Sequence, residues 1–179
     1  MLFAFVFILG AVIGSFLNVC IYRLPLGKSI VRPRSHCPFC EHTIGWFDNI
    51  PLLSYLVLGG RCRKCGRPIP VRYFLVELAG ALSGVVLLLF FPFGAGFIAY
   101  WAFSFMLITV VGIDIEHQEI PDIITIPGMC IGVALMTLLR LDSSASHLTS
   151  LVNSLAGLLA GGLSMFLMGF SGELIFRKE

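Results

Sequence analysis

Long apolar runs constrain this chain more than any other feature of its sequence. Hydrophobic residues make up 58% of the 179 residues and charged residues only 12%, which is more apolar than a soluble domain of this size. Residues 2–21 are almost wholly apolar, and a helix of that length crosses the roughly 30 Å of hydrocarbon in a bilayer. Comparable runs occur at 73–91, 96–113, 123–139 and 148–170. We therefore predict an all-α polytopic membrane protein with about five transmembrane helices.

Polar residues divide the predicted protein into three regions. Residues 1–22 form the first transmembrane helix, which has neither a basic start nor a signal-peptidase site and which we expect to be retained. Residues 23–72 form a polar loop domain rich in proline and glycine. Residues 73–179 form the remaining membrane domain.

Three features of the apolar runs predict how the helices pack. Gly10 and Gly14 are four positions apart in the first run, a pattern that lets a second helix approach closely. Asn18 near the end of that run is expected to hydrogen-bond inside the helix bundle. Tyr100 and Trp101, near the outer end of the 96–113 run, are expected to anchor that helix at the membrane interface.

The distribution of basic residues predicts the orientation. Nine of the 12 Lys and Arg residues lie between Arg23 and Arg72, and such loops stay in the cytoplasm. Counting crossings from this loop returns residues 114–122 to the cytoplasmic side. The two outer turns, 92–95 and 140–147, hold only one base between them. We therefore expect the loop domain and residues 114–122 to share one face of the membrane.

Two Cys-x-x-Cys pairs lie in the basic loop. The pairs are Cys37 with Cys40 and Cys62 with Cys65, a spacing typical of tetrahedral thiolate zinc sites. Four thiolates leave no open coordination position, so we expect a structural zinc ion that contributes much of the folding free energy of the loop. The alternatives are two redox-active dithiols or free thiols.

A cluster of acids follows the 96–113 run. Four carboxylates and a histidine occur within residues 114–122, and acids at a membrane edge are costly enough to be functional candidates. Asp114 ends the predicted helix, where the helix dipole disfavours an ionised carboxyl group and so favours one that holds or shares a proton. Asp122 is a second catalytic candidate, or else it caps the next helix. The intervening Glu116, His117 and Glu119 are expected to be solvated loop residues.

Aspartic protease chemistry needs a second carboxyl group that shares the proton of the first. The candidate partners for Asp114 are Asp122, Glu77 and Glu173. Glu77 lies inside the 73–91 run, where it either pairs with Arg72 or another loop base or faces the substrate. A proton or ion transporter would need acids deep in several helices, so we rank transport last.

At this point many ordered motifs resemble one known family. The motifs are Gly14-Ser15-Phe16-Leu17-Asn18-Val19, Arg23-Leu24-Pro25, Ser35-His36-Cys37-Pro38-x-Cys40, Asn49-Ile50-Pro51-Leu52-Leu53-Ser54-Tyr55, Gly59-Gly60-Arg61-Cys62-Arg63-x-Cys65-Gly66, Arg72-Tyr73-x-x-Val76-Glu77, and Asp114 through Ile120-Pro121-Asp122. Together they cover essentially the whole chain, which resembles the type IV prepilin peptidases.

The resemblance implies an aspartic protease of the intramembrane type. Asp114 matches the first catalytic aspartate of the family, which opens an Asp…Ile/Leu-Pro-Asp motif. The second belongs to a Gly-x-Gly-Asp motif, which does not occur in these 179 residues. We therefore expect the second aspartate beyond Glu179, a sequence truncated at its C-terminal end, and no prepilin cleavage by this chain alone.

The resemblance also implies substrates, cofactors and location. Such a bifunctional enzyme cleaves the leader peptide of type IV prepilins or pseudopilins, for type IV pili or type II secretion, at the cytoplasmic face of the bacterial inner membrane. It then methylates the new N-terminus with S-adenosylmethionine. We expect prepilins and the lipid bilayer as partners and no nucleic acid. The alternative is a non-catalytic zinc-knuckle scaffold for pilus or secretion-system assembly.

Overall fold

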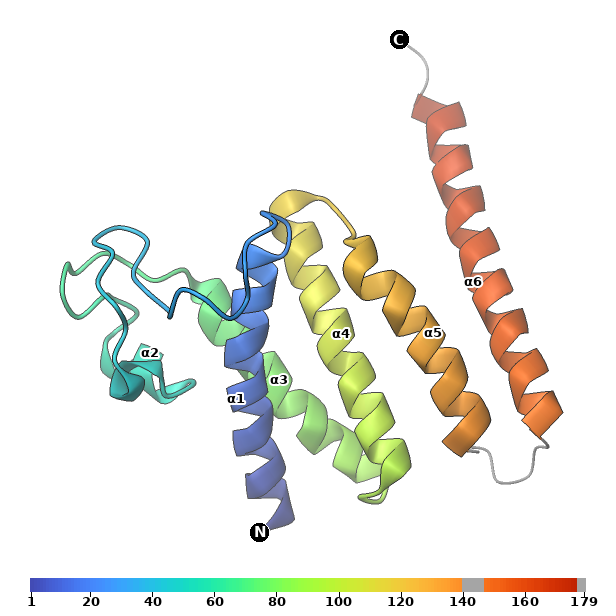
Figure 1. Ribbon diagram of the computed structural model, residues 1–179, viewed down its shortest axis with the longest axis horizontal. Helices are drawn as coiled ribbons and strands as arrows, with labels where there is room; N and C mark the ends of the chain where they lie inside the picture. Colours follow the sequence, from blue (N-terminus) through green and yellow to red (C-terminus); the bar gives the residue numbers. More distant parts are fainter. Residues whose placement is uncertain (140–146, 177–179) are drawn as a thin grey trace. The chain divides into compact units, whose positions relative to one another are not determined.

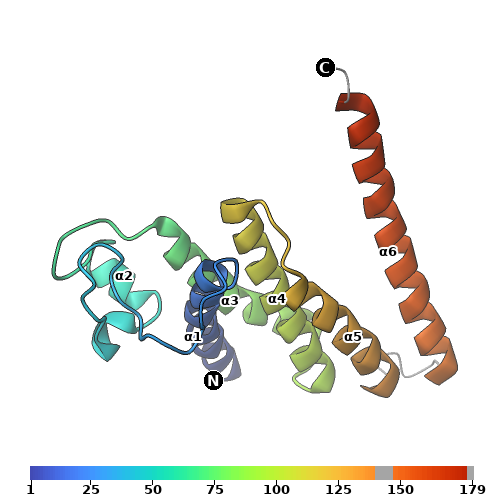
Figure 2. The ribbon, with the colours of Figure 1, turned by 45° about the horizontal axis from the view of Figure 1, so that its top comes forward.

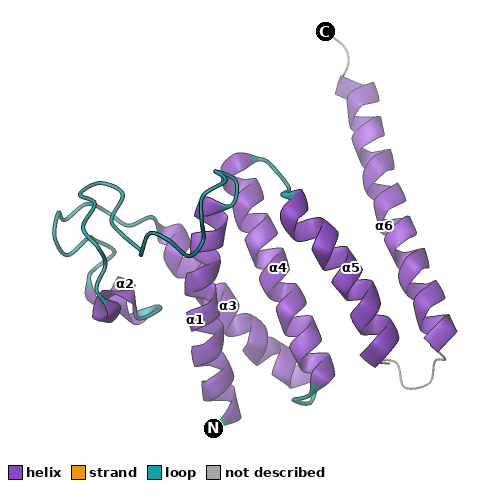
Figure 3. Ribbon diagram, viewed as in Figure 1, coloured by secondary structure: helices purple, strands orange, loops and turns teal. Residues whose placement is uncertain are grey.

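The computed structural model describes residues 1–139 and 147–176 (Figures 1 and 3). Within these ranges its regular secondary structure is helical apart from two isolated β-bridges, and loops and turns join the helices. The helices in chain order are α1 (Leu2–Arg23), the 3₁₀ helix η1 (Trp46–Asn49), α2 (Leu53–Val57), α3 (Val71–Phe90), α4 (Ala95–His117), α5 (Asp122–Leu139) and α6 (His147–Phe176).

All five predicted apolar runs form helices. Within the described ranges, α1, α3, α4 and residues 147–168 of α6 are long and apolar enough to cross a membrane, and α5 is a shorter apolar helix. The prediction of an all-α multi-pass architecture is therefore confirmed. The outer turn predicted at 140–147 lies outside the described residues except for His147, which begins α6.

The chain divides into two units. The first, Met1–Thr125, holds α1 to α4 and the first residues of α5, and the second, from Ile126 onward, holds the rest of α5 and α6. In the second unit, the ring nitrogen Nδ1 of His147 lies 3.0 Å from the backbone oxygen of Thr137, which links the start of α6 to α5.

Helices α1 and α3 pack closely at two glycines in each helix (Figure 2). A Cβ atom added to Gly10 would lie 2.4 Å from the backbone oxygen of Gly80, and one added to Gly14 would lie 2.8 Å from the Cα atom of Glu77. Gly84 similarly leaves room for Val6 and Trp101. The close approach predicted from Gly10 and Gly14 is confirmed, because only hydrogen atoms fit between these backbones.

Helix α4 completes the bundle of the first unit by packing against α1 and α3. One buried cluster joins Val6, Phe97 and Trp101, and a second joins Leu17, Ile21, Val76 and Ile113. Apolar residues from three helices thus form a continuous core, and its second cluster lies at the end of the bundle from which the polar loop emerges.

Two polar side chains inside this bundle find partners. Asn18 is buried and donates a hydrogen bond of 3.0 Å to the backbone oxygen of Tyr73, as expected. Trp101 was expected at the membrane interface, and this prediction is wrong. The residue is only 6% exposed, and its Nε1–H donates to Ser83 Oγ at 3.2 Å. Gly84 has no side chain, which leaves room for this indole in the core.

Candidate functional site

The four loop cysteines form one cluster. Their sulfur atoms all lie within 4.8 Å of one another, and Cys37 Sγ and Cys65 Sγ are 3.8 Å apart. A tetrahedral ion with metal–sulfur bonds of about 2.3 Å separates its sulfurs by about 3.8 Å. Cys37, Cys40, Cys62 and Cys65 can therefore hold a metal ion, as their spacing predicts.

The two halves of the cluster have the same local fold. In the first, Cys37 N–H donates to the backbone oxygen of His42, and Glu41 N–H donates to that of Cys37. In the second, Cys62 N–H donates to Arg67 and Gly66 N–H donates to Cys62 in the same way. Isolated bridges, His36 to Thr43 and Arg61 to Pro68, close both turns. Two matching knuckles thus present two sulfurs each to one point.

The residue after each second cysteine has a left-handed backbone conformation. Gly66 has a φ of 69° and Glu41 a φ of 54°. Glycine adopts this conformation without steric cost, whereas glutamate does not. When the two Cys-x-x-Cys pairs are aligned, Cys65-Gly66 corresponds to Cys40-Glu41. This internal repeat in the sequence could have predicted that the two knuckles share one local fold.

Backbone N–H groups stabilise the thiolate form within the cluster. Those of Cys65 and Lys64 lower the pKa of Cys62 to about 6. The backbone N–H of Arg67 likewise acts to lower the pKa of Cys65, but desolvation and the three neighbouring cysteine side chains outweigh it and raise that pKa to about 11. The second knuckle is therefore built to present at least one ionised sulfur, the form that binds metal.

Helix α4 continues past the predicted end of its apolar run. It includes Asp114 and ends at His117, where Gln118 adopts a left-handed conformation with φ of 54° and donates to the backbone oxygen of Asp114 at 2.8 Å. The Asp114 side chain is exposed in the last turn. Asp114 therefore lies on a helix, one turn before its end.

Glu116 is in the same last turn and forms an ion pair with Arg72 at the start of α3. The expectation that Glu116 and His117 lie in a loop is therefore wrong, because both belong to α4, although Glu116 remains exposed to solvent. His117 Nε2 lies 4.0 Å from the Glu116 carboxylate. The ion pair between Arg72 and Glu116 places the end of α4, with Asp114, at the same end of the first unit as the loop that carries the cysteines.

Asp122 begins α5 instead of preceding it. The backbone oxygen of Pro121 accepts the first helical hydrogen bonds, from Ile124 and Thr125. Asp122 is thus the first residue of α5, one position after the N-cap position predicted for it. A carboxylate there still interacts favourably with the helix dipole. Asp114 and Asp122 lie on consecutive helices, on either side of the connection 118–121. Their catalytic roles stay predictions.

Glu77 is buried in α3, and its carboxylate Oε2 accepts a hydrogen bond of 2.8 Å from the backbone N–H of Leu52. The loop base Arg72 pairs with Glu116 instead. The Glu77 side chain therefore contacts a backbone N–H of the loop domain. The substrate-facing role of Glu77 stays a prediction. The side chain of Glu173, the remaining candidate acid, lies outside the described residues.

The structure defines a class of protein: a multi-pass membrane protein with a loop whose four cysteines can hold a metal ion and with acidic side chains at one end of its helices. Comparison with known families narrows this class. Residues 8–91 match the Bacterial Peptidase A24 N-terminal domain, and residues 101–179 match the Type IV leader peptidase family. The chain belongs to the type IV leader peptidase family, which confirms the resemblance.

Curated relatives are similar along nearly the whole chain. The prepilin leader peptidase/N-methyltransferase of Myxococcus xanthus (strain DK1622) is 43% identical, and the match covers 98% of this chain and 50% of the relative. The type 4 prepilin-like proteins leader peptide-processing enzyme of Escherichia coli O78:H11 (strain H10407 / ETEC) is 38% identical, with 95% and 68% covered. For the Klebsiella pneumoniae prepilin leader peptidase/N-methyltransferase these values are 38%, 98% and 77%.

This chain spans about half the length of the first of these relatives and roughly two thirds to three quarters of the other two. No solved structure gives a significant match.

Proposed function

We propose that this protein removes the leader peptides of type IV prepilins or pseudopilins by an aspartic mechanism. The observation that carries the proposal is the Arg72–Glu116 ion pair. It brings the turn that contains Asp114 to the end of the bundle where the cysteine loop lies. Family membership and the names of the relatives supply the reaction type.

In this mechanism two carboxyl groups share one proton. The ionised one activates water and the protonated one donates to the carbonyl oxygen of the scissile peptide bond. We assign Asp114 to one of these roles. For the second carboxyl we propose the aspartate of the Gly-x-Gly-Asp motif that the family resemblance implies, with Asp122 as the alternative within this chain.

The location of Asp114 suits a substrate that is itself held in the membrane. A prepilin anchored by its apolar helix presents the leader junction at the membrane surface, the level at which α4 ends. A glycine before the cleaved bond lets the substrate backbone approach the acids closely. The surplus of bases in residues 23–72 favours the cytoplasmic face of the bacterial inner membrane for both loop and acids.

We propose zinc as the ion of the cysteine cluster. Four sulfurs at tetrahedral separations fit a closed structural site, which zinc occupies more readily than harder cations. Such an ion would stabilise the two knuckles, since few residues of the loop are buried. The names of two relatives add N-methylation, for which S-adenosylmethionine would supply the methyl group. We assign no described residue to that donor.

Processing of a prepilin in cells that lack their own prepilin peptidase tests the proposal. The protein is expressed from its whole gene, and the ratio of mature to precursor pilin is measured by immunoblot. Asp114→Asn should lower processing by at least about 10²-fold, the typical contribution of a general acid or base, while the exposed neighbour variant Glu119→Gln should process normally. Normal processing by an equally abundant Asp114→Asn protein would refute the aspartic mechanism and favour a scaffold.

A further inference from the structure

The loop between α1 and α3 contains an apolar segment, residues 44–58, that we call the docked segment. It comprises η1, α2 and the residues joining them. Its large apolar side chains point outward: Trp46 is 82% exposed and Val57 78%, while Leu56 and Leu53 are 63% and 60% exposed. Such a cluster on one short segment marks an interaction surface.

The docked segment is fastened to α3 inside the predicted membrane span. The ring of Tyr55 lies 5.4 Å from that of Phe74, and the N–H of Leu52 donates to Glu77. Phe74 and Glu77 are in the first two turns of α3. At 1.5 Å per residue, Glu77 lies about 9 Å along the helix from Val71. Since the 20 residues of α3 match the thickness of the hydrocarbon, the Leu52 contact lies below the membrane surface.

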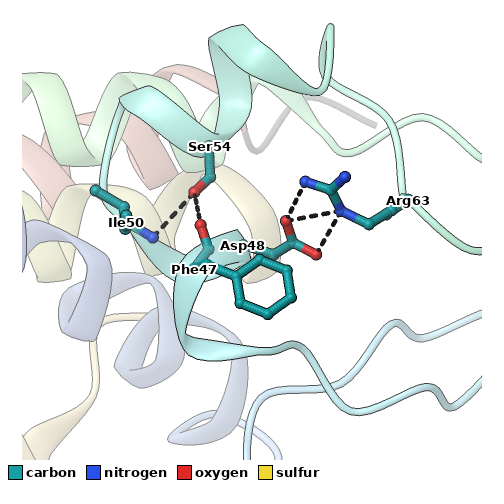
Figure 4. A network of polar contacts seen from close by, with 5 residues as sticks. All are labelled: Phe47, Asp48, Ile50, Ser54 and Arg63. Carbon is teal, nitrogen blue, oxygen red and sulfur yellow. Dashed lines mark hydrogen bonds and ion pairs between the residues drawn. The ribbon is translucent and has the colours of Figure 1, made fainter.

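Several backbone groups of the docked segment are paired with other groups of the protein. Ser54 Oγ accepts the N–H of Ile50 and donates to the backbone oxygen of Phe47, both at 3.0 Å (Figure 4). Leu52 has a φ of 63°, which is strained for a branched side chain, and Glu77 accepts the N–H that this conformation turns toward α3. Pairing of backbone groups within the protein lowers the cost of placing them where lipid replaces water.

The single charge of the docked segment is neutralised. Asp48 is paired with Arg63 at 2.7 Å, with three hydrogen bonds between the two groups (Figure 4). The Arg63 side chain remains 57% exposed and also lies over the ring of Phe47. Arg63 thus neutralises the Asp48 carboxylate and packs on an aromatic ring while much of its side chain stays exposed. Such an arginine suits the headgroup region of a bilayer, where anionic lipids attract bases.

We propose that the docked segment inserts into the bilayer beside α3, with its apolar side chains at the boundary between lipid headgroups and acyl chains. Interfacial helices bury their apolar face about 5–10 Å deep, which agrees with the depth of the Glu77 contact. The loop domain is then held against the membrane at the height where α4 ends. The inference does not depend on the proposed function.

Fluorescence of Trp46 in lipid nanodiscs tests the insertion. The chain has two tryptophans, so the emission of Trp46 is the difference between the unmodified protein and Trp46→Phe, a substitution at an exposed site. In nanodiscs of phosphatidylcholine and phosphatidylglycerol, bromine atoms placed high on the acyl chains should remove most of this emission. Aqueous iodide should remove little.

Two results would overturn the proposal. Trp46 emission that iodide quenches as strongly as free tryptophan, with no effect of bromine, would place the segment in water. Emission protected from both quenchers would show that protein covers the segment, as an apolar peptide partner would.

The fastening role of Glu77 has its own matched pair of variants. Glu77→Gln keeps an oxygen that can accept the Leu52 N–H, whereas Glu77→Leu removes it. We expect quenching by bromine to persist in Glu77→Gln and to fall in Glu77→Leu. Equal quenching in the two variants would overturn the fastening role, and circular dichroism confirms that both remain helical.

Discussion

The close packing of α1 against α3 makes Gly10→Ala a sharp test of the fold. The added Cβ would lie 2.4 Å from the backbone oxygen of Gly80 and 2.9 Å from the Cα atom of Ala81. Ordinary carbon–oxygen contacts begin at about 3.3 Å, so the helices must separate by about 1 Å at this point. Overpacking of this kind costs about 1–3 kcal/mol.

Alanine offsets part of that cost because it favours the helix by up to about 1 kcal/mol over glycine. We therefore expect Gly10→Ala to lower the free energy of unfolding by about 1–2 kcal/mol. Titration of the detergent-solubilised protein with sodium dodecyl sulfate, followed by tryptophan emission, measures this change. Trp101 is a suitable probe because it packs on Val6 of α1.

Gly157→Ala is the matched control for this experiment. Gly157 is in α6, and among the described residues of the second unit nothing outside its own stretch of helix lies within 4 Å of the position of an added Cβ. The same substitution there should leave stability unchanged or raise it by up to about 1 kcal/mol. If Gly10→Ala is as stable as Gly157→Ala, the close α1–α3 contact is wrong.

Three further predictions concern the loop and its contacts. Cys37→Ser should lose the bound zinc in elemental analysis, and unchanged zinc content would contradict the four-sulfur site. Glu41→Gly should raise the thermal stability of the loop and Gly66→Ala should lower it, each by about 1 kcal/mol, because a left-handed backbone disfavours non-glycine residues; changes of the same sign would contradict the two matching knuckles. Arg72→Ala should cost about 0.2–1 kcal/mol, and pairing Arg72→Glu with Glu116→Arg should restore stability in low salt; no rescue would show that the ion pair is unimportant.

Much of the membrane fold follows from the sequence because lipid permits few alternatives. An apolar run of about 20 residues must form its backbone hydrogen bonds internally, so it becomes a helix. The Gly10 and Gly14 pattern similarly indicates a contact surface, since only small residues let backbones meet. The cysteine cluster is predictable for a related reason: a short turn can hold two sulfurs at one ion.

Helix ends are less predictable than helix interiors. The 96–113 run marks where the sequence stops being apolar, but α4 continues to His117. Helical hydrogen bonding continues through Asp114 and Glu116. An acidic residue at the membrane edge can belong to a helix when water or a base pairs with its carboxylate. For Glu116 that base is Arg72, which is distant in sequence, so local patterns could not identify it.

The contact between the docked segment and α3 depends on backbone geometry that the sequence does not encode locally. Leucine rarely adopts positive φ, so nothing at Leu52 signals that its N–H turns toward Glu77. A buried acid in a span did indicate an unusual partner. Identifying the partner required the three-dimensional arrangement, in which a backbone N–H takes the place of the expected base.

The most direct test of the proposed function is mass spectrometry of a prepilin after incubation with the purified protein expressed from its whole gene. The reaction contains S-adenosylmethionine and is run with the unmodified protein and with Asp114→Asn. We predict that the unmodified protein yields a pilin shortened by its leader and methylated at the new N-terminus, while Asp114→Asn leaves the precursor intact. Appearance of the shortened pilin with Asp114→Asn would contradict the assignment of Asp114 as a catalytic acid.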